Sequence, residues 1–176
     1  MPIRISVTGD LGSGKSTICR QLNKRYNLGI YSTGAIQRKI AAEMGMSTFD
    51  LNKYMENHPE IDRRIDDGLA DLSAARDDIV IDSRMAWHFV KDTYKVFLIA
   101  DGTVAAKRVF GDDIRTSEKY SDIEDAKLQL KERKASENHR YRQKYGVDCG
   151  DLQNYDIVVD TTGAPPAYIA DIIMAG

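Results

Sequence analysis

The residues of this chain that most clearly predict chemistry form a glycine-rich segment, residues 9–16, which reads Gly-x-x-x-x-Gly-Lys-Ser. A strand-like apolar run precedes it and a helix-like segment follows it, which is the setting of a phosphate-binding P-loop and disfavours a turn without a ligand. Backbone N–H groups in such a loop surround phosphate oxygens, and the helix N-terminus adds positive potential. Lys15 can reach the β- and γ-phosphates, and the Ser16 hydroxyl can hold Mg²⁺. ATP and Mg²⁺ are therefore the expected cofactors, and the expected nucleotide-binding residues are Gly9, Gly12, Ser13, Gly14, Lys15, Ser16 and Thr17.

The elements that must carry this loop alternate along the chain. Four apolar runs rich in Val and Ile predict buried strands, at residues 3–8, 79–82, 94–99 and 156–160, and residues 28–31 form a weaker fifth run. Helical patterns lie between them, and a last helix is expected from Pro165-Pro166 to about Met174. This alternation predicts an α/β fold of the P-loop NTPase type, a three-layer sandwich with a central parallel sheet of about five strands. The length of 176 residues fits one domain, 1–176.

Two regions interrupt the simple alternation. Residues 33–76 form a helical insert, with helices expected at 36–44, 48–57 and 59–75. Residues 104–146 contain a stretch rich in glycine and charge, followed by a long helix from about 122 to 144. Lids and acceptor-binding segments are built from such inserts. We therefore expect residues 33–76 to close over an acceptor and residues 104–121 to close over ATP. The alternative is that both regions are only packing elements of the fold.

Composition narrows the function classes. Hydrophobic residues make up 42% of the chain and charged residues 30%, with a net charge of −2, so neither nucleic acid nor an anionic membrane is an expected partner. No apolar run is long enough to cross a bilayer, and a signal-peptide pattern is missing. Cys19 and Cys149 are the only cysteines, which predicts free thiols. We expect a cytoplasmic protein that is a monomer or a weak dimer and binds small-molecule substrates.

Charged side chains follow the strand expected at residues 79–82. Ligands of open α/β sheets bind beyond the carboxyl ends of the strands, so Asp82 and Arg84 should lie near the P-loop. Asp82 is either a carboxylate on the Mg²⁺ side or a cap of the next helix. Arg38 lies one turn into the insert, and Arg108 lies on the helix after the strand at residues 94–99. Planar guanidinium groups suit phosphate.

The long helix carries one stripe of residues separated by three or four positions. Its first half is apolar and its second half is charged, and its members are Ile123, Ala126, Leu130, Arg133, Glu137 and Arg140. Buried charges are costly unless they are paired or bound to something. The charged half therefore either leaves the core for solvent, which is the usual behaviour of charge runs, or lines a polar cavity.

The chain resembles the cytidylate kinases, within the P-loop nucleoside monophosphate kinase superfamily. The matching segments are the P-loop, residues 32–38 (Ser-Thr-Gly-Ala-Ile-Gln-Arg), residues 81–84 (Ile-Asp-Ser-Arg) and the run Glu132-Arg133…Glu137…Arg140. The tail from residue 145 to residue 161 is especially similar to the short form common in archaea. Three positions depart from the family pattern: Lys134 and Glu137 stand where Asp is usual, and Gln37 stands where an aromatic residue is frequent.

The resemblance implies specific roles. Thr33, Arg38 and Arg84 would hold the acceptor phosphate, and Arg133, Glu137 and Arg140 would reach the acceptor nucleotide. Arg108 would stabilise the transferring phosphoryl group from the lid side. The implied catalytic residues are thus Lys15, Arg84, Arg108, Arg133 and Arg140, and the implied metal-side residues are Ser16 and Asp82.

The expected reaction is the ATP-dependent phosphorylation of a nucleoside monophosphate, with CMP and dCMP leading. Two alternatives remain at this point. One is a kinase of the same fold that phosphorylates a hydroxyl group, with Asp82 as the base. The other is an ATP-binding regulatory protein that transfers no phosphoryl group.

Overall fold

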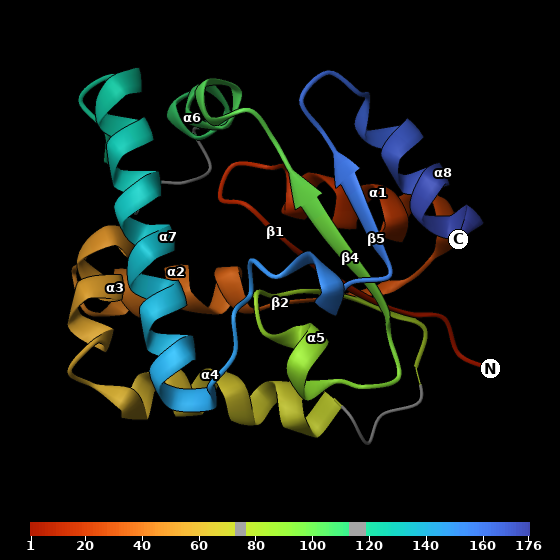
Figure 1. Ribbon diagram of the computed structural model, residues 1–176, viewed down its shortest axis with the longest axis horizontal. Coiled ribbons are helices and arrows are strands. Elements are labelled where there is room, and N and C mark those ends of the chain that lie inside the picture. The colour runs from red at the N-terminus through yellow and green to blue at the C-terminus, as the bar shows by residue number, and fades with distance from the viewer. Residues whose placement is uncertain (73–76, 113–118) are drawn as a thin grey trace.

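A five-stranded parallel sheet forms the centre of the computed structural model, which describes residues 1–72, 77–112 and 119–176 (Figure 1). The strand order is β2-β3-β1-β4-β5, and every neighbouring pair is parallel. The strands are β1 (Arg4–Gly9), β2 (Gly29–Ser32), β3 (Ile79–Asp82), β4 (Tyr94–Ile99) and β5 (Ile157–Asp160). The predicted α/β sandwich with five parallel strands is confirmed. No strand bound differs from the predicted one by more than one residue.

Helices cover both faces of this sheet. They are α1 (Lys15–Tyr26), α2 (Thr33–Glu43), α3 (Thr48–Met55), α4 (Pro59–Leu72), α5 (Ala86–Phe89), α6 (Gly102–Phe110), α7 (Ile123–Tyr145) and α8 (Pro166–Ala175), with a short 3₁₀ turn, η1 (Leu152–Asn154). Among the described residues, none of these helices is long and apolar enough to cross a membrane.

The first helix of the insert begins earlier than predicted. The expected helix at residues 36–44 starts at Thr33, because the Ser32 hydroxyl caps it by accepting a hydrogen bond from the Ala35 N–H at 3.2 Å. The next helix, α3, ends at Met55 rather than at 57. Residues 73–75 of the expected third helix, and residues 113–118 of the expected lid, lie outside the described part of the chain.

The main core lies between the sheet and helices α1 and α8, which pack side by side on one face (Figure 1). Its fully buried side chains include Val7, Leu22, Leu98 and Ile173. The opposite face is covered by α5 and by parts of α4 and α7. This packing holds the carboxyl ends of β1 and β3 fixed, and the P-loop follows the first of them.

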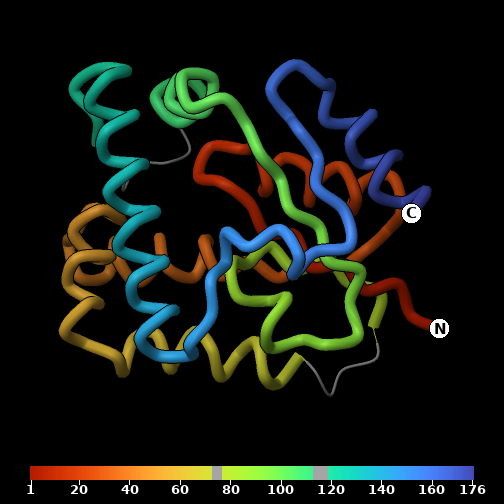
Figure 2. The backbone as a smooth tube through the Cα atoms, in the orientation of Figure 1, coloured from red at the N-terminus to blue at the C-terminus, as the bar shows by residue number. Residues whose placement is uncertain are grey.

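The long helix α7 contacts two separate parts of the molecule, as the tube in Figure 2 makes plain. Near its N-terminus, Ala126 and Leu130 pack against Ala105 and Val109 of α6. Near its C-terminus, Tyr141 packs in a cluster with residues of α4 and α5. One helix therefore connects the two regions that interrupt the alternation of strands and helices.

Candidate active site

The P-loop packs tightly against its neighbours, and two glycines make this possible. Gly9 has a φ of 150°, and a Cβ at this position would lie 2.3 Å from the carbonyl oxygen of Leu98 on β4. Gly12 has a φ of 77°, and a Cβ there would lie 2.7 Å from the carbonyl oxygen of Ala105 on α6. Both positions favour glycine through their backbone conformation and through the lack of space. The loop is consequently held between β4 and α6, directly before α1.

Lys15 and Ser16 stand at the first turn of α1. The Lys15 ammonium group donates to the carbonyl oxygens of Gly9 and Asp10 at 3.0 and 2.9 Å, so the lysine lies over its own loop. The Ser16 hydroxyl donates to Asp82 Oδ2 at 2.9 Å. The sequence-predicted pair Ser16 and Asp82 is therefore in direct contact, although the two residues come from different elements.

Asp82 does not cap the following helix. That helix, α5, begins at Ala86, and its N-cap is Met85, which makes no side-chain capping bond. Asp82 Oδ2 instead accepts from Ser16 and, at 3.3 Å, from the Ser32 hydroxyl. Within the described chain, no three His, Cys, Asp or Glu side chains form a metal cluster. A hydroxyl and one carboxylate still fit Mg²⁺ bound with nucleotide phosphates, because this ion takes few protein ligands in such sites.

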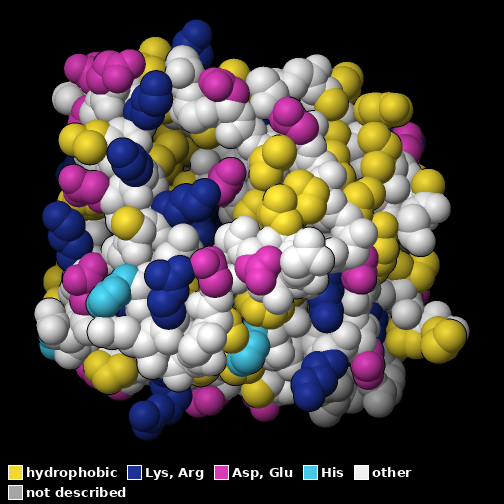
Figure 3. Space-filling view, in the orientation of Figure 1, with side chains coloured by type: hydrophobic (Ala, Val, Ile, Leu, Met, Phe, Trp, Pro, Cys, Tyr) yellow, Lys and Arg dark blue, Asp and Glu magenta, His cyan; other side chains and the backbone are white. Residues whose placement is uncertain are grey.

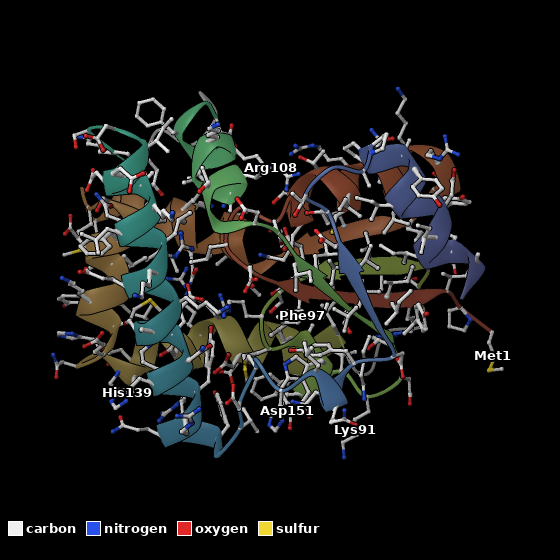
Figure 4. The ribbon with its side chains drawn as sticks, turned by 45° about the horizontal axis from the view of Figure 1, so that its top comes forward. Met1, Lys91, Phe97, Arg108, His139 and Asp151 are labelled. Carbon is white, nitrogen blue, oxygen red and sulfur yellow. The ribbon has the colours of Figure 1, made fainter. Side chains whose placement is uncertain are left out.

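A cavity of about 510 Å³ opens on the α6 side of the P-loop and is lined by Gly12, Ser13, Thr17 and Arg108, among others. The hydroxyl of Ser13 is buried and has no hydrogen-bond partner among the described residues. Figure 4 shows Arg108 on α6, beside the ends of β4 and β5. Its guanidinium group donates to the Thr161 hydroxyl at 3.0 Å and to the Thr161 carbonyl oxygen at 2.6 Å. Arg108 thus borders the nucleotide-sized space next to the loop.

A second cavity lies on the other side of the P-loop, between the loop and the helical insert. It encloses about 60 Å³, which is small for a ligand site. Thr33, Arg38 and Arg84 line it together with Lys15 and Ser16. The Thr33 hydroxyl donates to the Asp82 carbonyl oxygen at 3.4 Å. The predicted acceptor-phosphate residues are therefore gathered next to the phosphate loop.

Glu137 is the centre of a buried ion cluster in this second cavity. Its Oε1 accepts from Arg133 Nε at 3.0 Å, and its Oε2 lies 3.0 Å from Arg84 Nε. Burial alone would raise the pKa of Glu137, but the charges of Arg84 and Arg133 hold this pKa below its usual value. The geometry of the Arg84 contact is that of an ion pair rather than an aligned hydrogen bond. Arg84 NH1 is buried and has no hydrogen-bond partner among the described residues.

The charged half of the α7 stripe is buried, so the solvent-exposed alternative for it is wrong. Arg133, Glu137 and Arg140 are 7%, 1% and 5% exposed. Figure 3 shows other lysine and arginine side chains on the surface over α7, where they are exposed to solvent. The stripe points inward because its apolar first half packs on α6 and fixes the rotation of the helix.

Arg140 lies apart from the other two charged residues of the stripe. Its guanidinium group donates to Asp62 Oδ2 at 3.1 Å, to the Asn52 carbonyl oxygen at 3.0 Å and to the Asn52 side-chain oxygen at 3.2 Å. It does not appear among the described residues that line the cavity. The structure therefore brings Arg133 and Glu137 to the cavity and places Arg140 in the wall behind it, joining α7 to α3 and α4.

Sequence reasoning missed several residues that line this cavity. They are Gln37, Asp62, Ile65, Asp66, Leu69, Met85 and Tyr141. A signal for two of them was present: Asp62 and Asp66 lie beside the apolar positions Ile65 and Leu69 of one helix, where solvent-facing acids are not expected. Both aspartates are buried, at 5% and 7% exposure.

The sequence is similar to the sequences of known proteins. The sequence model of the cytidylate kinase-like family matches residues 4–163. A protein named cytidylate kinase from Thermoplasma volcanium is 35% identical over an alignment 176 positions long, which covers 98% of this chain and 90% of that protein. Another cytidylate kinase, from Pyrococcus abyssi, is 36% identical over 173 residues, which cover 97% of this chain and 91% of that protein.

Among solved structures, a shikimate kinase from Acinetobacter baumannii shares the fold. Its TM-score is 0.61 at 16% sequence identity, and the match covers 99% of this chain and 92% of that one. At this identity the likeness concerns the fold alone. The assignment rests instead on the family match over most of the chain and on the similarity to full-length relatives: the chain belongs to the cytidylate kinase-like family.

Proposed function

We propose that this protein transfers the γ-phosphoryl group of ATP to a nucleoside monophosphate, with CMP and dCMP as its preferred acceptors. The observation that carries the proposal is the set of guanidinium groups, Arg38, Arg84 and Arg133, in one cavity with Lys15 and Ser16 of the P-loop. Several guanidinium groups gathered in one cavity favour an anionic ligand, because planar cationic donors suit phosphate. The family to which the chain belongs, and the names of its relatives, support the same reaction.

In the proposed reaction, an oxygen of the acceptor phosphate attacks the γ-phosphorus, and the bond from this phosphorus to the β,γ-bridging oxygen breaks, which releases ADP. The attacking oxygen is already anionic, so no general base is needed. The protein acts by positioning and by neutralising charge. Thr33, Arg38 and Arg84 hold the acceptor phosphate, Arg108 borders the ATP side, and Lys15 follows the transferring group. Mg²⁺ held near Ser16 and Asp82 would supply further neutralisation of phosphate charge.

The small volume of the acceptor cavity bears on how the substrate enters. About 60 Å³ is too little for a nucleotide, since ligand cavities are roughly 300–1,000 Å³. Entry therefore requires the helices of the insert, within residues 33–76, to move away from the P-loop and close again. Such closure excludes water and limits wasteful hydrolysis of ATP.

The direct test is the release of ADP from ATP–Mg²⁺ with a panel of acceptors: CMP, dCMP, UMP, AMP, GMP and shikimate as a hydroxyl acceptor. We expect the highest kcat/KM for CMP and dCMP, with UMP second and the purines poor. A higher value for a purine monophosphate or for a hydroxyl acceptor would overturn the proposal. ATP hydrolysis with no transfer to any acceptor would favour a regulatory protein instead.

A second prediction concerns Asp82. Its replacement in Asp82→Asn removes a charge that contacts the Ser16 hydroxyl but preserves size and hydrogen bonding. We expect the Mg²⁺ concentration that gives half-maximal activity to rise about tenfold, because metal ligands and their close partners contribute factors of this size. Titration of Mg²⁺ at saturating ATP measures this half-maximal concentration. Asp78→Asn at the opposite end of β3 is the control, and an equal response in both variants would contradict the metal-side assignment.

A further inference from the structure

Two aspartates of α4, Asp62 and Asp66, line the acceptor cavity in addition to the residues already discussed. Both are buried. The side chains beside them in the cavity wall are Ile65, Leu69, Met85 and Tyr141, which offer an apolar surface. The cavity therefore has a cationic part at the P-loop and a part along α4 that combines apolar contact with acidic oxygens. A planar base with a hydrogen-bond donor on its edge matches this second part.

The two aspartates differ in how their oxygens are used. Asp62 Oδ2 accepts from Arg140 Nε at 3.1 Å, within the buried network that joins α7 to α3 and α4. Asp66 receives a hydrogen bond from Lys144 Nζ at 3.2 Å and another from the Tyr145 hydroxyl. Both of these end on Oδ2. Among the described residues Asp66 Oδ1 accepts no hydrogen bond, so it is the carboxylate oxygen available to a ligand in the cavity.

The pyrimidines differ at the position that such an oxygen would contact. Cytosine carries an amino group on C4, which donates hydrogen bonds, whereas uracil carries a carbonyl oxygen, which only accepts. A carboxylate pairs with the first and repels the second. We propose that Asp66 Oδ1 accepts a hydrogen bond from the 4-amino group of cytosine and thereby sets the preference for CMP over UMP. This inference rests on the proposed function and names a residue that determines its specificity.

The ionisation of Asp66 gives the proposal a second consequence. Burial raises the pKa of Asp66 to about 6, while the neighbouring Lys144 opposes the increase. Below this pH the protonated carboxyl group can donate a hydrogen bond to O4 of uracil, so discrimination against UMP weakens. The charged or titratable groups around Asp66 are Asp62 and Asp67 on α4, Lys144, Tyr145 and Tyr141 on α7, Arg140 beyond Asp62, and His88 of α5 against Tyr145.

The ratio of kcat/KM for CMP to that for UMP isolates this effect. Both acceptors carry the same phosphate, whose own ionisation cancels in the ratio, and the groups that act on the phosphate cancel with it. In Asp66→Asn, an amide can present either a donor or an acceptor to the base. We expect the ratio to fall by about 10- to 100-fold in this variant, since unpaired or mispaired hydrogen bonds to charged groups have effects of this size. Asp67→Asn removes the same charge from an exposed position of the same helix and should leave the ratio at pH 8, where Asp66 is ionised in both proteins, unchanged.

The pH dependence tests the same idea without any substitution. The CMP-to-UMP ratio of the wild-type protein should fall between about pH 8 and pH 5.5, and the ratio of Asp66→Asn should stay flat over that range. The wild-type measurement tests the role of Asp66 even if the Asp66→Asn protein folds poorly. A wild-type CMP-to-UMP ratio that does not change over this pH range, or a variant that keeps the full preference, would overturn the role of Asp66 and leave the proposed function intact. A wild-type protein that phosphorylates neither pyrimidine would overturn the proposed function itself.

Discussion

Replacing Lys15 with alanine is expected to lower kcat by about 10³-fold, the largest effect on activity that we predict. The Lys15 ammonium group lies over the P-loop, where it donates to the carbonyl oxygens of Gly9 and Asp10 at 3.0 and 2.9 Å. Bound phosphates would compete with these carbonyl groups for the same cation. As charge moves from the transferring group toward ADP, Lys15 can follow it, and no other cation of the described P-loop is placed to do so.

The fold should survive this substitution, because the Lys15 side chain is only partly buried and lies at the first turn of α1. Steady-state kinetics with ATP and CMP measure the loss, and thermal unfolding checks the fold. Lys24→Ala, in the exposed last turn of the same helix, is the matched control and should keep near-normal activity. A Lys15→Ala protein with more than about a tenth of the wild-type kcat would show that the lysine does not act on the transferred group.

Glu137→Gln is expected to have the largest effect on stability. The substitution removes a negative charge that is in direct contact with both Arg84 and Arg133, and all three side chains are nearly inaccessible to solvent. Breaking a buried pair leaves a cation uncompensated, which costs about 3–5 kcal/mol. We expect the free energy of unfolding, measured with urea at neutral pH, to fall by about that amount. Glu132→Gln, on the exposed face of the same helix, should change it by less than about 0.5 kcal/mol.

The same cluster predicts how stability depends on pH. The pKa of Glu137 is lower in the folded protein than in the unfolded chain, because Arg84 and Arg133 stabilise the carboxylate against its burial. Its contribution is therefore fully present above the unfolded pKa of about 4.3 and is lost as the pH falls through the folded value. Urea unfolding of the wild type between pH 6 and pH 3 should show this loss, and Glu137→Gln should show a smaller one. Parallel curves for the two proteins would contradict the assignment.

The fold could be predicted well because its signals are local. Runs of Val and Ile marked four of the strands, a weaker run marked β2, and the strand–loop–helix context of residues 9–16 marked the phosphate loop. Errors at helix ends came from side chains that cap at close range, such as the Ser32 hydroxyl, which starts α2 before the first apolar residue of the pattern. The alternation of elements is also what places Asp82 and Arg84 next to the P-loop, since parallel strands share one carboxyl edge.

The acceptor side could be predicted only in part. Helical spacing put Arg133, Glu137 and Arg140 on one face, yet it could not say that Arg140 pairs with Asp62, because the two residues are 78 positions apart and belong to different helices. The same limit hid Asp66. The role of Asp66 depends on its contacts with Lys144 and Tyr145 and on the cavity that Asp66 lines, and both exist only once α4 and α7 have packed together.

The contacts of α7 have a thermodynamic consequence for the two substrates. Its N-terminal half packs on α6, whose Ala105 carbonyl group abuts the P-loop at Gly12, and its other half packs on the helices of the acceptor cavity. A rigid element shared by both sites lets one ligand bias the conformation that the other requires. The resulting linkage is reciprocal. If bound ATP raises the affinity for the acceptor by some factor, the bound acceptor must raise the affinity for ATP by the same factor. Weakening the packing of Leu130 on α6 should therefore shrink both factors equally, although this side chain touches neither ligand site directly.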